Sequence, residues 1–374
     1  MFDILLSLSI AFFICFLAIP VIVTVAEGKK LFDIPDARKI HNKPIPSLGG
    51  LGIFAGFILS CLIIIPFAGS PEIQYFFAAA FVIFFLGLKD DILDISPIKK
   101  FIGQVMAAFL IVYKGGIQIH SMHGFLGLQG DLPPMFSLIF TYLTVIVIIN
   151  SFNLIDGVDG LAGSLALMAS LVFGFYFSSV NMMPYAVMAF ALSGSLIAFL
   201  IFNFQPAKIF MGDTGSLLLG LIHAILVIKF INVAGSPGVA VPVAASPAIG
   251  FTILLIPLMD TLRVFAIRIF HRRSPFSPDR NHIHHLLIDK GLSHRTITLT
   301  LVGVNLVLIA AAYALRSIGC TWLIFGLFTV FFTGISGLYY TRKRTRLFVA
   351  TTNKGAEGSS KIVPLTKDAV LEQK

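Results

Sequence analysis

The chain has 374 residues, of which 57% are apolar and only 12% charged, and its formal net charge is +9. Soluble domains usually contain about 45–50% apolar and about 25% charged residues, so the composition excludes a water-soluble globular protein. It equally excludes disordered, collagen-like and disulfide-framework proteins. Most of the surface must therefore face something other than water, and we expect that surrounding to be a lipid bilayer.

Long apolar runs predict membrane helices, because a helix needs about 20 apolar residues to cross the hydrocarbon core. We expect an all-α polytopic membrane protein with about eleven spans, near residues 4–25, 48–68, 74–88, 101–113, 135–150, 162–179, 184–202, 214–232, 246–267, 297–315 and 321–341. The sequence after residue 345 lacks apolar periodicity. We therefore expect a membrane domain over residues 1–345 and a disordered cytoplasmic tail over 346–374.

The basic residues are distributed unequally between the two sides that these spans define. One set of connections, together with Arg263 and the tail from Arg342, holds 24 of the 27 Lys and Arg residues. Cytoplasmic loops are enriched in Lys and Arg, so the amino terminus is expected outside and the carboxyl terminus in the cytoplasm. Such loops and anionic lipid account for most of the net charge, and no nucleic-acid partner is expected.

Acidic residues are scarce, and three of them directly follow the third apolar run. If that helix continues, Asp90 and Asp94 share one face with Asp91 beside them, which makes a carboxylate cluster at the membrane surface. Mg²⁺ binds through one or two carboxylates together with substrate phosphates. The alternative is a solvated helix end with Lys89 and Lys99 as counter-charges.

A second polar segment lies between two later apolar runs. It places Asn150, Asn153, Asp156 and Asp159 at steps of three, with a glycine directly after each acid and no basic residue. A loop needs only one or two such residues for its turns, and glycine permits close approach of a ligand to the backbone. The segment therefore indicates a binding or catalytic role.

A third segment places Asp213 and Thr214 at the expected amino terminus of a helix. Free backbone N–H groups at such a terminus suit a phosphate and its metal ion. A capping role alone would explain Asp213, but it would not explain the nearby Asn203 and Lys208.

The last basic loop, residues 268–285, brings several histidines and arginines together. These are His271, His282, His284 and His285 with Arg268, Arg272, Arg273 and Arg280. The histidine spacing could suggest zinc, but no nearby Cys or acid set completes a tetrahedron. Binding of phosphate by Arg and His is the better physical fit.

Five blocks in this order resemble the polyprenyl-phosphate N-acetylhexosamine-1-phosphate transferase family: residues 36–50, 90–94, 150–162, 209–216 and 274–285. The resemblance implies that undecaprenyl phosphate attacks the β-phosphate of a UDP-N-acetylhexosamine and releases UMP, as the first membrane step of cell-surface polysaccharide synthesis. It also implies Mg²⁺, with Mn²⁺ as an alternative, and a bacterial inner-membrane location. The oligomeric state stays open, with a homodimer as one option.

The resemblance also implies roles for single residues. Asp213 matches the metal ligand, and Asp90 and Asp91 would serve the metal and the lipid phosphate. The catalytic group would comprise Asp90 and Asp91 with Asp156, Asp159 and His282. The implied substrate-binding positions are Asn150, Asn153, Asn203, Phe210, Arg268, Arg280, His284 and His285.

Two alternative functions remain at this point. The muramoyl-pentapeptide transferases of the same family carry three consecutive histidines in the last loop, whereas this chain reads His-Ile-His-His over residues 282–285, which looks like the N-acetylglucosamine branch. The alternative of another class is a membrane transporter, because intramembrane acids often mark ion or substrate pathways. Here the acids cluster at one face, which favours the enzyme.

Overall fold

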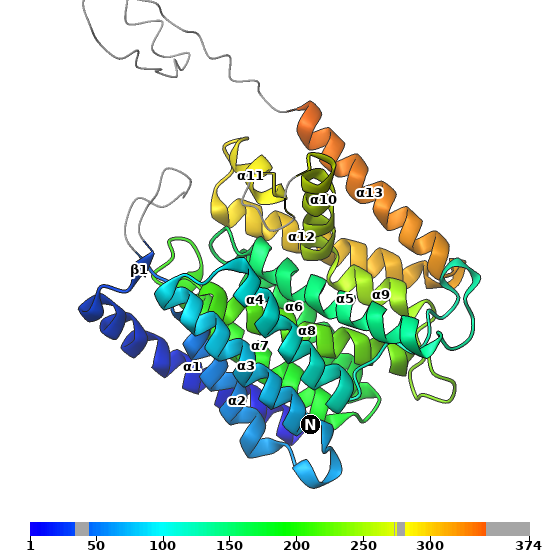
Figure 1. Ribbon diagram of the computed structural model, residues 1–374, viewed down its shortest axis with the longest axis horizontal. Helices are drawn as coiled ribbons and strands as arrows, with labels where there is room; N and C mark the ends of the chain where they lie inside the picture. Colours follow the sequence, from blue (N-terminus) through cyan, green and yellow to red (C-terminus); the bar gives the residue numbers. More distant parts are fainter. Residues whose placement is uncertain (34–44, 273, 275–280, 342–374) are drawn as a thin grey trace, which may run out of the picture.

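The computed structural model describes residues 1–33, 45–272, 274 and 281–341, and these form a bundle of helices (Figure 1). The first eight helices are α1 (Phe2–Lys29), α2 (Gly49–Ile64), α3 (Glu72–Leu93), α4 (Pro97–Phe109), α5 (Pro134–Ile155), α6 (Leu161–Ser179), α7 (Met183–Asn203) and α8 (Gly212–Ala234). The remaining five are α9 (Ser246–Ile253), α10 (Leu255–Phe270), α11 (Ile283–Ile288), α12 (His294–Ala314) and α13 (Cys320–Tyr340). The predicted tail, 346–374, lies outside the described residues.

A few shorter elements complete the described chain. A π-helical turn, η2 (Leu110–Lys114), continues α4, and three 3₁₀ turns are η1 (Phe67–Gly69), η3 (Phe125–Gly127) and η4 (Arg316–Ile318). The strands β1 (Phe32–Asp33) and β2 (Ile45–Pro46) form a small antiparallel pair. This pair and an isolated antiparallel bridge between Ser121 and Asp131 depart from the predicted all-α class in the part of the chain that the structure describes.

Seven described helices are long and apolar enough to cross a membrane, namely α1, α5, α6, α7, α8, α12 and α13. This agrees with the predicted polytopic membrane class. Each of the eleven predicted apolar runs contains helix, although α2, with 16 residues, is shorter than a usual span.

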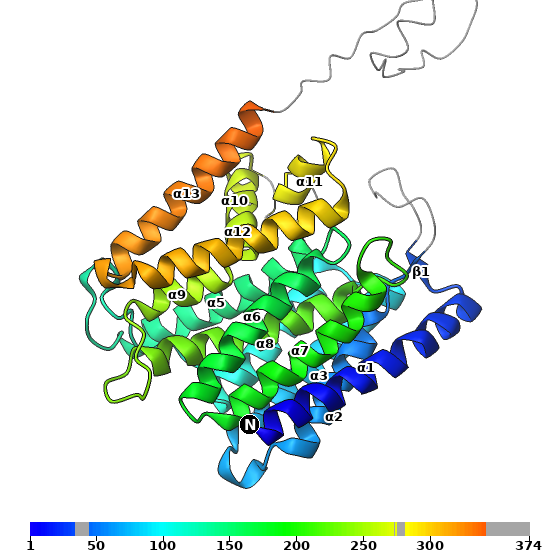
Figure 2. The same ribbon diagram turned by 180° about the vertical axis from the view of Figure 1, so that it is seen from behind.

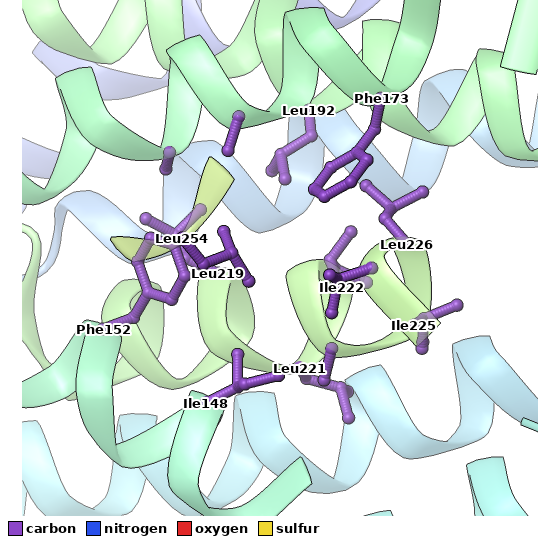
Figure 3. Packing of buried hydrophobic residues seen from close by; sticks show 14 of the residues in the cluster. Ile148, Phe152, Phe173, Leu192, Leu219, Leu221, Ile222, Ile225, Leu226 and Leu254 are labelled. Atoms are coloured by element: carbon purple, nitrogen blue, oxygen red, sulfur yellow. The ribbon is translucent and has the colours of Figure 1, made fainter. Parts of the chain in front are cut away.

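Helix α8 lies at the centre of the bundle. Of its 23 residues, 18 are buried, and a helix that is apolar on all sides belongs in the interior. Figure 3 shows Leu219 and Ile222 of α8 among Phe152 of α5, Phe173 of α6 and Leu192 of α7. Because neighbours surround α8, the position of its amino-terminal end is fixed by the whole bundle.

The predicted span 246–267 is wrong as a single helix, because the chain breaks at Leu254 into α9 and α10. Pro257 has no N–H to donate to the carbonyl of Ile253 four residues earlier, and its ring would clash with that carbonyl. The carbonyl instead accepts from Nδ2 of Asn305 on α12, at 3.1 Å. In both views α10 stands with α11 at the end of the molecule away from the amino terminus (Figures 1 and 2).

The predicted loop 151–161 is also wrong over its first residues, because α5 continues to Ile155. Asn150 and Asn153 are therefore helical. Residues 150–155 contain no glycine or proline, and the Nδ2 of Asn150 donates to the carbonyl of Ile146 one turn earlier, at 2.8 Å. The helix ends only where the glycines begin.

The expected shared face of Asp90 and Asp94 is not formed. α3 ends at Leu93, and Asp94 follows it with a φ of 43° and an exposed side chain. The carboxylate of Asp90 accepts the backbone N–H of Ile95 at 2.8 Å, which closes the chain around the helix end. Asp94 consequently does not continue the helical stripe that carries Asp90.

Candidate active site

The amino terminus of α8 meets three other helix ends, namely the carboxyl ends of α3 and α5 and the amino end of α4. Side-chain contacts join these ends directly. Together they collect Asp90, Asp91, Lys100, Asn153 and Asp213, which we call the Asp213 cluster. Four of these five residues were predicted as site residues from sequence blocks that lie far apart in the chain.

Asp91 caps the amino terminus of α8. One carboxylate oxygen accepts the N–H of Asp213 at 2.7 Å, and the other accepts the N–H and the hydroxyl of Thr214 at 3.0 and 2.5 Å. Gly212 has a φ of +70°, and a Cβ there would lie 2.7 Å from both oxygens of Asp91, so glycine is required at this close approach. The cap fixes α3 to α8; a metal-binding or catalytic role of Asp91 stays a prediction.

Lys100, in the first turn of α4, lies between two of the predicted metal ligands. Its Nζ pairs with Oδ2 of Asp213 at 2.5 Å and also with Oδ2 of Asp90. The other oxygen of Asp213 accepts from Nδ2 of Asn153 at 2.9 Å, and that nitrogen also lies 3.0 Å from Oγ of Ser216. Asp90 and Asp213 thus converge on one positive charge.

Asp156, just beyond the end of α5, adds a further acid to this surrounding. Burial, followed by the negative charges of Asp213, Asp91 and Asp159, raises the pKa of the Asp156 carboxyl to about 8. Burial is the larger cause of this raised pKa, and the charges of the three other acids add to it.

The oxygen ligands of the Asp213 cluster fit Mg²⁺. Asp90 and Asp213 already share the ammonium of Lys100, so their carboxylates converge on one cationic position. Among the described residues, no three His, Cys, Asp or Glu side chains form a complete metal cage. Mg²⁺ is commonly held by one or two carboxylates, with substrate phosphates and water supplying the other oxygens. The arrangement therefore suits an ion that is completed by an anionic substrate.

A second group of predicted residues lies on α10 and α11. His282, at the amino terminus of α11, places Nδ1 2.8 Å from Oδ2 of Asp260 and Nε2 3.5 Å from the guanidinium of Arg268. The rings of His282 and His284 are parallel, with centroids 5.6 Å apart. We call His282, His284, Arg268 and Asp260 the histidine group.

The loop after α5 connects the two groups. The ring of His284 packs against Gly157, where a Cβ would lie 2.9 Å from its Cε1. Asp159 pairs with Nδ1 of His294 on α12 at 3.2 Å, and its carbonyl accepts from the Thr298 hydroxyl at 3.0 Å. The chain segment that carries Asp156 and Asp159 therefore touches both α11 and α12.

His284 is 2% exposed, and its Nδ1 has no hydrogen-bond partner among the described residues. Burial, and then the neighbouring His285, lower the pKa of His284 to about 3. Its imidazole is consequently neutral near pH 7. Any contact of His284 with a substrate would use a neutral ring rather than a positive charge.

Two other predicted substrate-binding amides have protein partners. The Oδ1 of Asn203 accepts the N–H of Gly160 at 2.9 Å, and its Nδ2 donates to the carbonyl of Ile209 at 2.8 Å. Asn150 exchanges amide contacts with Gln104 of α4 at 2.9 and 3.4 Å. These contacts tie the surrounding loops and helices together, and substrate binding by either amide stays a prediction.

The remaining predicted positions lie around these groups. Phe210 has a partly buried side chain, and its backbone joins residues 45–50 to the start of α8. Its N–H donates to the carbonyl of Pro46 at 2.7 Å, and its carbonyl accepts from the N–H of Gly49 at 2.9 Å. The ring centroids of His284 and His285 lie 4.4 Å apart. Arg280 lies outside the described residues.

Sequence reasoning missed three residues that the structure brings into the site: Lys100, Asp260 and His294. Lys100 was hidden among the lysines of a connection predicted to be cytoplasmic, where the charge rule already explains a basic residue. Asp260 was hidden inside a predicted apolar span. Pro257, three residues before it, was the available signal, because a proline inside an apparent span indicates a break.

Comparison with known proteins gives consistent similarities. A family model described as glycosyl transferase family 4 matches residues 73–231, from α3 to α8. The undecaprenyl-phosphate alpha-N-acetylglucosaminyl 1-phosphate transferase of Yersinia pestis is 31% identical, over 81% of this chain and 82% of the relative. The Escherichia coli K12 protein of the same name is 30% identical over 72% of each chain. The decaprenyl-phosphate N-acetylglucosaminephosphotransferase of Mycobacterium leprae is 32% identical over 74% of this chain and 75% of the relative.

Proposed function

Because the chain belongs to glycosyl transferase family 4, we propose that it transfers N-acetylglucosamine 1-phosphate from UDP-N-acetylglucosamine to undecaprenyl phosphate. An oxygen of the lipid phosphate forms a bond to the β-phosphorus, the bond from that phosphorus to the bridging oxygen breaks, and UMP leaves with that oxygen. The observation that carries the proposal is the convergence of Asp90, Asp213 and Lys100 at one end of the bundle.

Charge neutralisation is the main chemical task of such a site, since both reactants are anions that repel each other. Mg²⁺ would be held by Asp213 and Asp90, and it supplies positive charge to the phosphates and orients them. Lys100 is placed to bind a phosphate oxygen beside these acids, and Asn153 holds Asp213 in position. Arg268 contributes a further donor from α10, and His282 lies beside it at the start of α11.

The membrane arrangement that we propose has eleven spans. Helices α2, α3, α4 with η2, and the pair α9 and α10 join the seven longer helices, which gives an amino terminus outside and a carboxyl terminus in the cytoplasm. The excess of Lys and Arg on one set of connections supports this orientation. Both groups of site residues then face the cytoplasm in a bacterial inner membrane, where a lipid phosphate lies at the headgroup plane.

Among the alternatives, the N-acetylglucosamine substrate is favoured over the muramoyl-pentapeptide substrate. The relatives from Yersinia, Escherichia and Mycobacterium all carry N-acetylglucosamine in their names. The transporter has no comparable support, because the described acids of the site gather at one end of the bundle rather than along a path through it.

The test is an assay with purified full-length protein, undecaprenyl phosphate, Mg²⁺ and UDP-N-acetylglucosamine labelled in the sugar. We expect labelled lipid and one UMP per lipid formed, loss of product with EDTA, and recovery with Mg²⁺ or Mn²⁺. UDP-N-acetylmuramoyl-pentapeptide is tested in parallel. Product from that donor alone would contradict the proposed sugar, and no product from any UDP-sugar would contradict the proposed reaction.

A further inference from the structure

We propose that Asp260 is a positioning residue that fixes the tautomer and the ring orientation of His282 in the transfer reaction. The inference rests on the proposed function and adds a residue to it. Asp260 lies on α10, 22 positions before His282, and the break at Leu254 brings the two together. Because α10 takes a new direction after this break, Asp260 meets α11 instead of continuing the line of α9.

The two oxygens of Asp260 have separate partners. Oδ1 accepts from the guanidinium of Arg263 at 2.9 Å and from the backbone N–H of Ile283 at 2.9 Å. Oδ2 lies 2.8 Å from Nδ1 of His282. One oxygen therefore anchors the start of α11, and the other faces the imidazole.

Burial makes this contact decisive for the histidine. Asp260 is 1% exposed and His282 is 4% exposed, so water does not compete for Nδ1. A carboxylate oxygen accepts and does not donate, so Nδ1 carries a proton, and in the neutral imidazole Nε2 keeps its lone pair. Nε2 faces the guanidinium of Arg268, at 3.5 Å, and its lone pair can accept from that guanidinium, which the proposed function assigns to a phosphate.

A purely structural role of Asp260 makes a different prediction. If Asp260 only anchored α11, then the contacts of Oδ1 would carry its effect, and an acceptor at that one position would suffice. Asp260→Asn separates the two roles, because its amide oxygen can replace Oδ1 while its NH₂ faces Nδ1. That NH₂ would favour the opposite tautomer, with the proton on Nε2.

We expect Asp260→Asn to lower kcat by about 10- to 100-fold, the usual cost of losing a carboxylate that orients a functional histidine. The KM for UDP-N-acetylglucosamine should change little, whereas the melting temperature in detergent should fall, because the buried Arg263 loses its carboxylate partner. Asp260→Glu keeps the carboxylate and should recover part of the lost kcat. Asp289→Asn, at the exposed end of α11, is the matched control and should retain wild-type activity.

A double-mutant cycle with His282→Ala tests whether Asp260 acts through the imidazole. In the His282→Ala background, Asp260→Asn should lower the residual kcat by less than about 3-fold, because the group that it orients is gone. An undiminished loss in that background would overturn the proposal, as would wild-type activity of Asp260→Asn. If Asp260→Asn does not fold, Asp260→Glu is compared with wild type in both backgrounds, and equal losses there would also overturn it.

The wild-type reaction separates this proposal from the proposed function. If wild-type protein forms no lipid product, the function itself fails. If wild-type protein turns over and the cycle shows no coupling, only the role of Asp260 fails.

Discussion

Asp213 is the residue that makes the most contacts within the Asp213 cluster. Its two oxygens meet Asn153 and Lys100, and its backbone N–H is held by Asp91. These contacts come from three different helices, so Asp213 has a fixed position before any substrate arrives. A fixed carboxylate loses little freedom when it binds a metal ion, which is the meaning of preorganisation at such a site.

We expect Asp213→Asn to lower kcat by at least about 100-fold and to leave the protein folded, because the amide is nearly isosteric but a weak ligand for Mg²⁺. Steady-state kinetics and thermal unfolding in detergent measure the two effects. Lys99→Gln, at an exposed neighbour of Lys100, is the control for general loss of charge. Near-normal turnover of Asp213→Asn would refute the metal assignment.

The scarcity of acids made much of this site predictable from sequence. In a chain with few charges, Asp90, Asp156 and Asp213 stand out without any knowledge of the fold. Lys100 and Asp260 do not stand out, because Lys100 lies in a connection predicted to be cytoplasmic, where lysines are expected, and Asp260 lies inside a predicted apolar span. Only the tertiary contacts distinguish them from such residues.

The turn after α5 joins the Asp213 cluster to α11 through the contact of Gly157 with His284. Because α11 is only six residues long, its position depends on its neighbours more than on its own helical hydrogen bonds. The side of Gly157 that faces His284 is already filled by the ring.

We therefore expect Gly157→Ala to displace His284 and α11, and to lower kcat several-fold without unfolding the bundle. Kinetics and the melting temperature are measured beside Gly69→Ala, whose added methyl group meets no atom within 4 Å. Equal activity of the two variants would show that α11 tolerates displacement at this contact.

The existence of the helices was predictable, and several of their ends were not. Apolar runs marked every long helix, because burial in lipid requires them. The ends depend on side-chain contacts with the backbone, such as Asp90 with Ile95 and Asn305 with Ile253. Such contacts have no periodic pattern, so hydropathy could not reveal that α5 continues or that α9 stops.

The predicted orientation of the whole bundle has a direct test in intact cells. Single cysteines are introduced at Lys99 and at Gly130, which are exposed and lie in connections predicted on opposite sides. We expect a membrane-impermeant maleimide to label Gly130→Cys in intact cells, and Lys99→Cys only after permeabilisation.

The unsubstituted protein is the control for this labelling, since its three cysteines are buried. Labelling of Lys99→Cys from outside would reverse the orientation. Labelling of both positions from the same side would change the number of spans between them.

The peripheral helices and the central helix differ in how much of their surface is available to lipid. Only 17% of the apolar window of α1 is buried within the protein, and 28% and 22% of those of α12 and α13, against 78% of α8. A change in bilayer thickness acts on the helices that contact acyl chains, which respond by tilting. The outer helices can thus tilt with bilayer thickness, and we expect the depth of Asp213 on α8 to change less than that of residues on α1, α12 and α13.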